Sequence, residues 1–175
     1  MDKMLSVVLP AYNEEQMIKK TAQVVGDLLE KEQIPYELVF VNDGSKDHTW
    51  EKILELKEER AHIKGVCFSR NFGKEAAMYA GLEHSKGDYV VMMAVMDCDL
   101  QHPPETLIKM YRLWEDGYQV IEGVKASRGR ESFIHKMFAK TFYSIISDAT
   151  GIDMSRASDF KLMDRQAAEE FLKLP

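Results

Sequence analysis

Short apolar segments that favour strands alternate along this chain with longer segments whose apolar residues recur at helical spacing. This alternation is the feature that most constrains the fold. Strands separated by helices imply right-handed crossovers and a mostly parallel sheet. The sequence therefore predicts an α/β fold, Rossmann-like, with a mostly parallel sheet flanked by helices.

The expected strands follow from the apolar segments and the turn-forming residues between them. The segment 88–96 is nearly continuous in apolar residues, as a strand buried on both faces requires. Pro10 is expected to close the first strand and Asn13 to cap the first helix, while Asp47 or Thr49 begins the second. The expected strands are residues 5–9, 37–41, 63–69, 88–96, 119–124 and 160–163.

Length and charge exclude several classes of protein. A chain of 175 residues fits one domain, since domains usually run to roughly 100–200 residues. The formal charge of −6 and the pI of about 5.4 argue against a nucleic-acid partner. The longest apolar run, 89–96, falls far short of the roughly 20 residues that span a bilayer. Neither Cys67 nor Cys98 suggests a disulfide framework, so we expect a soluble domain in a reducing compartment.

Ligands of open parallel sheets bind beyond the carboxyl ends of the strands, which selects the segments to examine. Asp97, Asp99 and Gln101 follow the most apolar strand and share one face of an extended segment. Two carboxylates and an amide oxygen suit Mg²⁺ or Mn²⁺ shared with a diphosphate. The alternative is a solvated acidic turn. Asp159, before the last expected strand, is a candidate third carboxylate or simply a residue that starts that strand.

The turns after the first two strands are less specific. Gly44 permits a tight turn, and Asp43 can accept hydrogen bonds from a base or a ribose. Glu14 follows the first strand in a similar position. Ordinary turns between strands and helices fit both segments equally well, so the residues alone leave the choice open.

Two basic segments stand out in an acidic chain. Arg70 and Lys74 follow the third expected strand, at the same sheet edge as the aspartates. Lys125, Arg128 and Arg130 follow the fifth. Guanidinium and ammonium groups gathered at one edge favour an anionic substrate, although surface loops with solvated cations remain the alternative.

Five motifs together resemble one family. The chain resembles family 2 glycosyltransferases of the GT-A fold, and within them the branch that transfers a sugar to a polyprenyl phosphate. That branch includes dolichol-phosphate mannose synthase and undecaprenyl-phosphate glucosyltransferases. The motifs occur in family order across almost the whole chain, at residues 8–15, 40–45, 69–77, 97–105 and 159–164.

The resemblance implies roles for particular residues. Those implied for nucleotide binding are Pro10, Tyr12, Glu14 and Asp43, and those implied for the metal, Mg²⁺ or Mn²⁺, are Asp97, Asp99 and Gln101. Those implied for the acceptor phosphate are Lys125, Arg128 and Arg130, and those implied for catalysis are Asp97, Asp99 and Asp159. Asn42 departs from the family, which usually has Asp there.

The resemblance also implies an activity: inverting, metal-dependent transfer from a UDP- or GDP-sugar to a polyprenyl phosphate. The alternatives are transfer to a saccharide hydroxyl in cell-envelope polysaccharide synthesis, and a non-catalytic fragment that binds nucleotide sugars. Relatives continue beyond this point, so residues 1–175 are expected to be a catalytic domain lacking its C-terminal part and membrane-attaching segments. The full protein is then expected at the cytoplasmic face of a membrane, with homo-oligomerisation left open.

Overall fold

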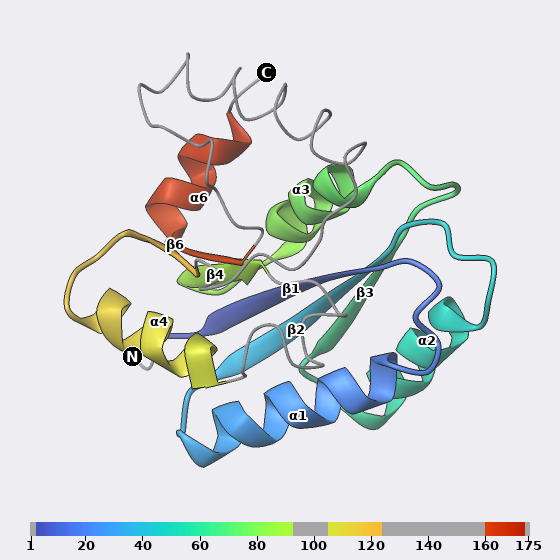
Figure 1. The fold of residues 1–175 in the computed structure, drawn as a ribbon, viewed down its shortest axis with the longest axis horizontal. Helices are drawn as coiled ribbons and strands as arrows, with labels where there is room; N and C mark the ends of the chain where they lie inside the picture. Colours follow the sequence, from blue (N-terminus) through green and yellow to red (C-terminus); the bar gives the residue numbers. More distant parts are fainter. Residues whose placement is uncertain (1–2, 93–104, 124–159, 174–175) are drawn as a thin grey trace, which may run out of the picture.

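A computed structural model describes residues 3–92, 105–123 and 160–173. These residues form three layers, with helices on both faces of a central sheet (Figure 1). The predicted α/β class is confirmed, and so is the alternation of strand and helix over the first 92 residues.

Six strands form one sheet within the described residues, in the order β3-β2-β1-β4-β6-β5. Strands β3, β2, β1 and β4 run parallel, while β6 is antiparallel to both of its neighbours, β4 and β5. The sheet is therefore mostly parallel, as predicted. The strands are β1 (Leu5–Ala11), β2 (Tyr36–Asn42), β3 (Ile63–Cys67), β4 (Tyr89–Met92), β5 (Val120–Glu122) and β6 (Lys161–Asp164).

Each face of the sheet has its own core. Helices α1 (Ile18–Lys31), α2 (Thr49–Glu59) and α4 (Glu105–Glu115) contribute to one buried cluster, and α3 (Lys74–His84) and α6 (Arg165–Leu172) to the other. Burial on both faces explains why β4 is apolar throughout. In the described part of the chain, no helix is both long and apolar enough to cross a bilayer.

Two predictions about the first loop are wrong. Pro10 does not close the first strand, because parallel pairing with β2 continues through Pro10 to Ala11. Asn13 does not cap the first helix, because its backbone adopts a left-handed φ of 54° and α1 begins only at Ile18. The second helix begins at Thr49, which was one of its two predicted starts.

A buried carboxylate joins the amino ends of the strands, opposite the edge where ligands are expected. Glu37 accepts hydrogen bonds from Ser6 Oγ (2.6 Å) and the Lys86 backbone N–H (2.6 Å), and pairs with Lys64. Burial raises the pKa of Glu37, but these partners outweigh burial and hold the pKa below its usual value. Ionised Glu37 therefore stabilises the fold at neutral pH.

We predict that Glu37→Gln destabilises the protein at pH 7 by about 1.5–3 kcal/mol, because a charged hydrogen-bonding partner is lost. A lowered pKa contributes stability above the usual glutamate pKa and loses it as the pH falls through the folded-state value. The deficit should therefore shrink in acid, as measured by urea unfolding at pH 7 and pH 3. Glu55→Gln, at an exposed ion pair with Lys19, is the control and should change little. An equal deficit at both pH values contradicts the prediction.

Candidate active site

The order of the strands locates the site. From β1 the chain proceeds through β2 to β3 on one side, and β4 lies on the other side of β1. Ligands of such sheets bind at this switch point, beyond the carboxyl ends of the strands. The loops after β1, β2 and β3 are described. Other predicted site residues lie outside the described residues, namely Asp97, Asp99, Gln101, Lys125, Arg128, Arg130 and Asp159.

The four residues predicted to bind the nucleotide lie at this edge. Pro10 is buried in β1, beside Val41 of β2. Tyr12 and Glu14 follow β1, and the ring of Tyr12 is exposed. Asp43 follows β2 directly, and its backbone N–H donates to the Ala11 carbonyl (2.9 Å). The parallel pairing of β1 with β2 therefore brings the two loops side by side.

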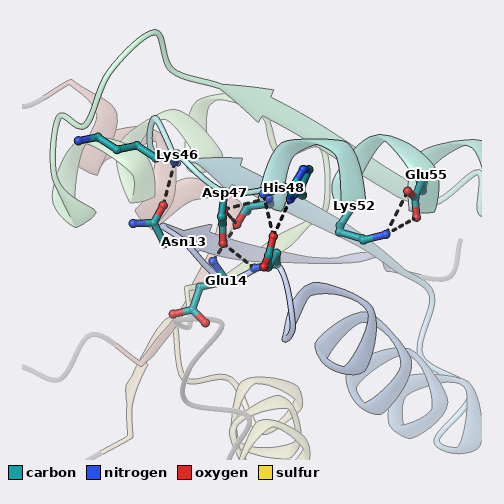
Figure 2. A network of polar contacts seen from close by, with 9 residues as sticks. Asn13, Glu14, Lys46, Asp47, His48, Lys52 and Glu55 are labelled. Carbon is teal, nitrogen blue, oxygen red and sulfur yellow. Dashed lines mark hydrogen bonds and ion pairs between the residues drawn. The ribbon is translucent and has the colours of Figure 1, made fainter.

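Reciprocal hydrogen bonds hold these loops together; we call residues 13–15 and 45–49 the loop clasp. The backbone N–H of Asn13 donates to Ser45 Oγ (3.0 Å). In return, the Lys46 N–H donates to Asn13 Oδ1 (2.8 Å) (Figure 2). The left-handed conformation of Asn13 accompanies this exchange. The side chain of Asn13 thus accepts a backbone N–H from the loop after β2, and not one from the first turn of α1.

The other half of the clasp involves three consecutive residues after β2. The Glu14 N–H donates to Thr49 Oγ1 (2.8 Å), and the Glu15 N–H donates to Asp47 Oδ2 (3.2 Å). The His48 N–H returns a bond to Glu15 Oε2 (2.9 Å). Asp47 Oδ1 also accepts from both the N–H (3.0 Å) and the hydroxyl (2.6 Å) of Thr49. The clasp was not predicted from the sequence, although two polar turn clusters after neighbouring strands were its signal.

Two carboxylates of the clasp differ in their surroundings. Burial raises the pKa of Asp47, but hydrogen bonds from Thr49 and Glu15 outweigh burial and lower the pKa overall. Glu14 uses only its backbone, and its side chain points away from the other labelled residues (Figure 2). Burial and then the charge of Asp47 raise the pKa of Glu14. Within the described ranges the Glu14 carboxylate accepts no hydrogen bond.

The third loop is tied to the second through Asp43. Asp43 is 4% exposed, and its carboxylate accepts the N–H groups of Phe72 (2.7 Å to Oδ1) and Gly73 (3.0 Å to Oδ2). Arg70 lies in this loop, and Lys74 begins α3. The structure thus places the first predicted basic segment at the same edge as the loop clasp.

The residues predicted to bind a metal lie outside the described part of the chain. The described residues contain no group of three or more His, Cys, Asp or Glu side chains that could hold a metal ion. The oxygen donors predicted for Mg²⁺ or Mn²⁺ all follow β4, at residues 97–101. Their metal-binding role stays a prediction.

Comparison with known proteins decides the family. The sequence profile of glycosyl transferase family 2 matches residues 6–172, almost the whole chain. The chain belongs to glycosyl transferase family 2. The predicted family is therefore confirmed.

Curated relatives match this family 2 chain along nearly its full length. An uncharacterised glycosyltransferase of Bacillus subtilis, YkcC, is 40% identical over 97% of this chain and 52% of its own length. The bactoprenol glucosyl transferase of Shigella phage SfX is 33% identical over 98% of this chain and 55% of its own length. The chain thus spans about half the length of the curated relatives it matches.

Solved structures share the fold. One is a mannosyltransferase from Pyrobaculum calidifontis in complex with GDP-Man and Mn²⁺, with a TM-score of 0.65 and 19% sequence identity. The match extends over all of this chain and 48% of the mannosyltransferase chain. Another is glucosyl-3-phosphoglycerate synthase from Mycobacterium tuberculosis in complex with Mn²⁺ and UDP-glucose, with a TM-score of 0.62 and 20% sequence identity. That match extends over 94% of this chain and 57% of the synthase chain. These likenesses concern the fold alone and confirm the GT-A class.

We predict that Thr49→Val destabilises the protein by about 1–3 kcal/mol, because the Glu14 N–H and Asp47 Oδ1 both lose a buried partner. Urea unfolding measures the loss, and exchange of the Glu14 amide proton should accelerate. Thr49→Ser keeps the hydroxyl and is the matched control. If the valine and serine variants behave alike, the clasp is not held by this hydroxyl.

We predict that Glu14→Gln raises the melting temperature at neutral pH. A raised folded-state pKa means that stability falls as the pH rises through that value, so the ionised carboxylate weakens the native fold. The gain should vanish in acid, where Glu14 is protonated. Melting curves followed by circular dichroism across pH 3–8 test this.

Glu15→Gln is the control, with the opposite sign. Hydrogen bonds from the backbone and ring of His48 lower the pKa of Glu15, so this carboxylate stabilises the fold above its usual pKa. The glutamine variant should therefore melt lower at neutral pH and match the native protein in acid. The same sign for both variants contradicts the assignment.

Proposed function

We propose that the whole protein transfers a sugar from a nucleotide-sugar donor to a polyprenyl phosphate. The observation that carries this proposal is the 33% identity with a bactoprenol glucosyl transferase over 98% of the chain, within family 2. Bactoprenol is a polyprenyl lipid, so the relative's name supports this acceptor class. Both UDP- and GDP-sugars are candidates, since solved neighbours contain one or the other.

The donor site that we propose lies between the loops after β1 and β2. Pro10 and Tyr12 line it, and Glu14 turns a carboxylate without a described partner toward the ligand. Carboxylates accept hydrogen bonds from ribose hydroxyls. Asp43 belongs to the same edge through its place at the end of β2. The clasp supports this proposal, because it fixes the two loops relative to each other before any ligand binds.

Asp97, Asp99 and Gln101 are proposed to hold Mg²⁺ or Mn²⁺. Their oxygen donors fit these hard cations, and a site with few protein carboxylates leaves positions for substrate phosphates. When bound, the metal supplies positive charge against the leaving diphosphate. The Mn²⁺ in the solved neighbours supports a divalent cation of this kind.

Lys125, Arg128 and Arg130 are proposed to bind the acceptor phosphate. A phosphate monoester has its second pKa near 6, so at pH 7 it is largely dianionic and attacks without a strong base. A single displacement at the anomeric carbon then inverts its configuration. Under this mechanism Asp159 orients the acceptor rather than removing a proton from it.

The rest of the protein is proposed to attach this domain to the cytoplasmic face of a membrane. A polyprenyl phosphate is itself confined to the bilayer by its hydrocarbon chain. The relatives are about twice as long as the matched region, which leaves ample sequence for such an attachment.

We predict that Asp97→Ala and Asp99→Ala each lower metal-dependent sugar transfer by at least ~10²-fold, because charge stabilisation of the leaving group is lost. The assay follows labelled sugar from UDP- and GDP-sugars into polyprenyl phosphate in membranes containing the full-length protein. Asp116→Ala, an exposed change beyond α4, should leave the rate unchanged. Unaltered activity in both site variants contradicts the metal assignment.

The same assay separates the alternatives. Transfer to a saccharide acceptor, with none to polyprenyl phosphate, supports the polysaccharide-synthesis alternative. Thermal stabilisation by a nucleotide with Mn²⁺, without any turnover, supports a domain that only binds nucleotide sugars. Stabilisation by UDP alone or by GDP alone identifies the donor base.

A further inference from the structure

The loop after β3, residues 68–73, is fixed to the end of β2 by several independent contacts. Both carboxylate oxygens of Asp43 accept backbone N–H groups of this loop, from Phe72 and Gly73. The Asn42 carbonyl accepts the N–H of Phe68 (2.9 Å). Asp43 is 4% exposed and its carboxylate is bonded through both oxygens, so the residue has little surface to offer a ligand.

Gly44 provides a second kind of contact with the same loop. A Cβ atom at this position would lie 2.3 Å from the carbonyl carbon of Arg70 and 2.5 Å from the nitrogen of Asn71. The φ of Gly44 is +65°, a conformation that also favours glycine. The Arg70–Asn71 peptide therefore rests directly against the backbone of Gly44, and any larger residue displaces it.

The loop presents one cation at the edge of the sheet. Arg70 is exposed, and its guanidinium carbon lies 4.7 Å from the ring centre of Phe72. That ring packs edge-on against Phe68, with centroids 5.5 Å apart. Within the described ranges Arg70 makes no ion pair with a carboxylate. Stacking limits the orientations of the guanidinium while leaving its N–H donors open to an anion.

We propose that Asp43 and Gly44 are positioning residues that seat this loop so that Arg70 binds a phosphate group of the substrate. The inference rests on the proposed function and refines the part that Asp43 plays in it. Asp43 acts through the loop backbone, and recognition of the base falls to other groups at the site. The phosphate belongs either to the donor diphosphate or to the lipid acceptor, since a guanidinium fits both.

Calorimetric titration of the full-length protein tests the donor side, using UDP and GDP against uridine and guanosine. Arg70→Ala should weaken nucleoside diphosphate binding roughly tenfold, the loss of a charge-assisted hydrogen bond, and leave nucleoside binding unchanged. Asp43→Asn should reproduce this pattern, because an amide offers only one acceptor for the two loop N–H groups. If Arg70 serves the acceptor instead, the KM for polyprenyl phosphate rises and the KM for the donor does not.

A double-mutant cycle distinguishes positioning from direct contact. If Asp43 acts through Arg70, Asp43→Asn should change affinity less than about twofold when Arg70 is already alanine. An equal loss in both backgrounds, or weaker nucleoside binding in the Asp43 variant, overturns the proposal. So does an Arg70→Ala variant with native affinities and native KM for both substrates.

Gly44→Ala keeps the Asp43 carboxylate and displaces the loop through its Cβ atom. This variant provides the test if Asp43→Asn fails to fold. It should weaken diphosphate binding or raise the KM for polyprenyl phosphate, and it should spare the nucleoside. Native affinity for the diphosphate together with a native KM for polyprenyl phosphate counts against the proposal. Melting curves establish that each variant is folded. Failure of the proposed function looks different: the native protein then binds no nucleotide and transfers no sugar.

Discussion

The arrangement of the site depends on the parallel pairing of β1 with β2. Every residue of β1 from Leu5 to Ala11 has a partner in β2, and the backbone contact continues one step further, from Asp43 to the Ala11 carbonyl. Glu14 and Thr49, 35 residues apart in sequence, can form a hydrogen bond only because both strands end at the same level. A slip of one residue in this register would turn each buried strand residue to the opposite face and separate the clasp.

The fold class could be predicted because its signal is local. Strand β4 is apolar at every position since helices cover both faces, and the preceding segments alternate with helical periods that are equally visible in sequence. The direction of β6 could not be predicted. An antiparallel strand of four buried or partly buried residues has the same composition as a parallel one, and its direction is visible only in its pairing with β4 and β5.

The position of the candidate site in the fold was predicted from the sequence, but the hydrogen bonds between its loops were not. Glu14 and Asp43 were selected because strand ends meet at one edge of a parallel sheet, and Pro10 and Tyr12 were implied by the family resemblance. The structure places all four at that edge. The role of Asn13 depends on Lys46 in another loop, which no local pattern reveals. The side-chain oxygen that would accept a backbone N–H at a helix cap can equally accept any backbone N–H that the tertiary structure brings close to it.

The acidic residues at this edge look alike in sequence but differ in the number of hydrogen-bond donors that their carboxylates receive. Asp43 and Asp47 each accept several N–H or O–H donors, so their charges are compensated within the fold. The carboxylate of Glu14 has no such partner among the described residues and lies near the charge of Asp47. Stability alone would favour a neutral side chain at this position. A carboxylate at the switch point of the sheet that the described residues leave without a hydrogen-bond donor fits the proposal that Glu14 contacts the donor nucleotide.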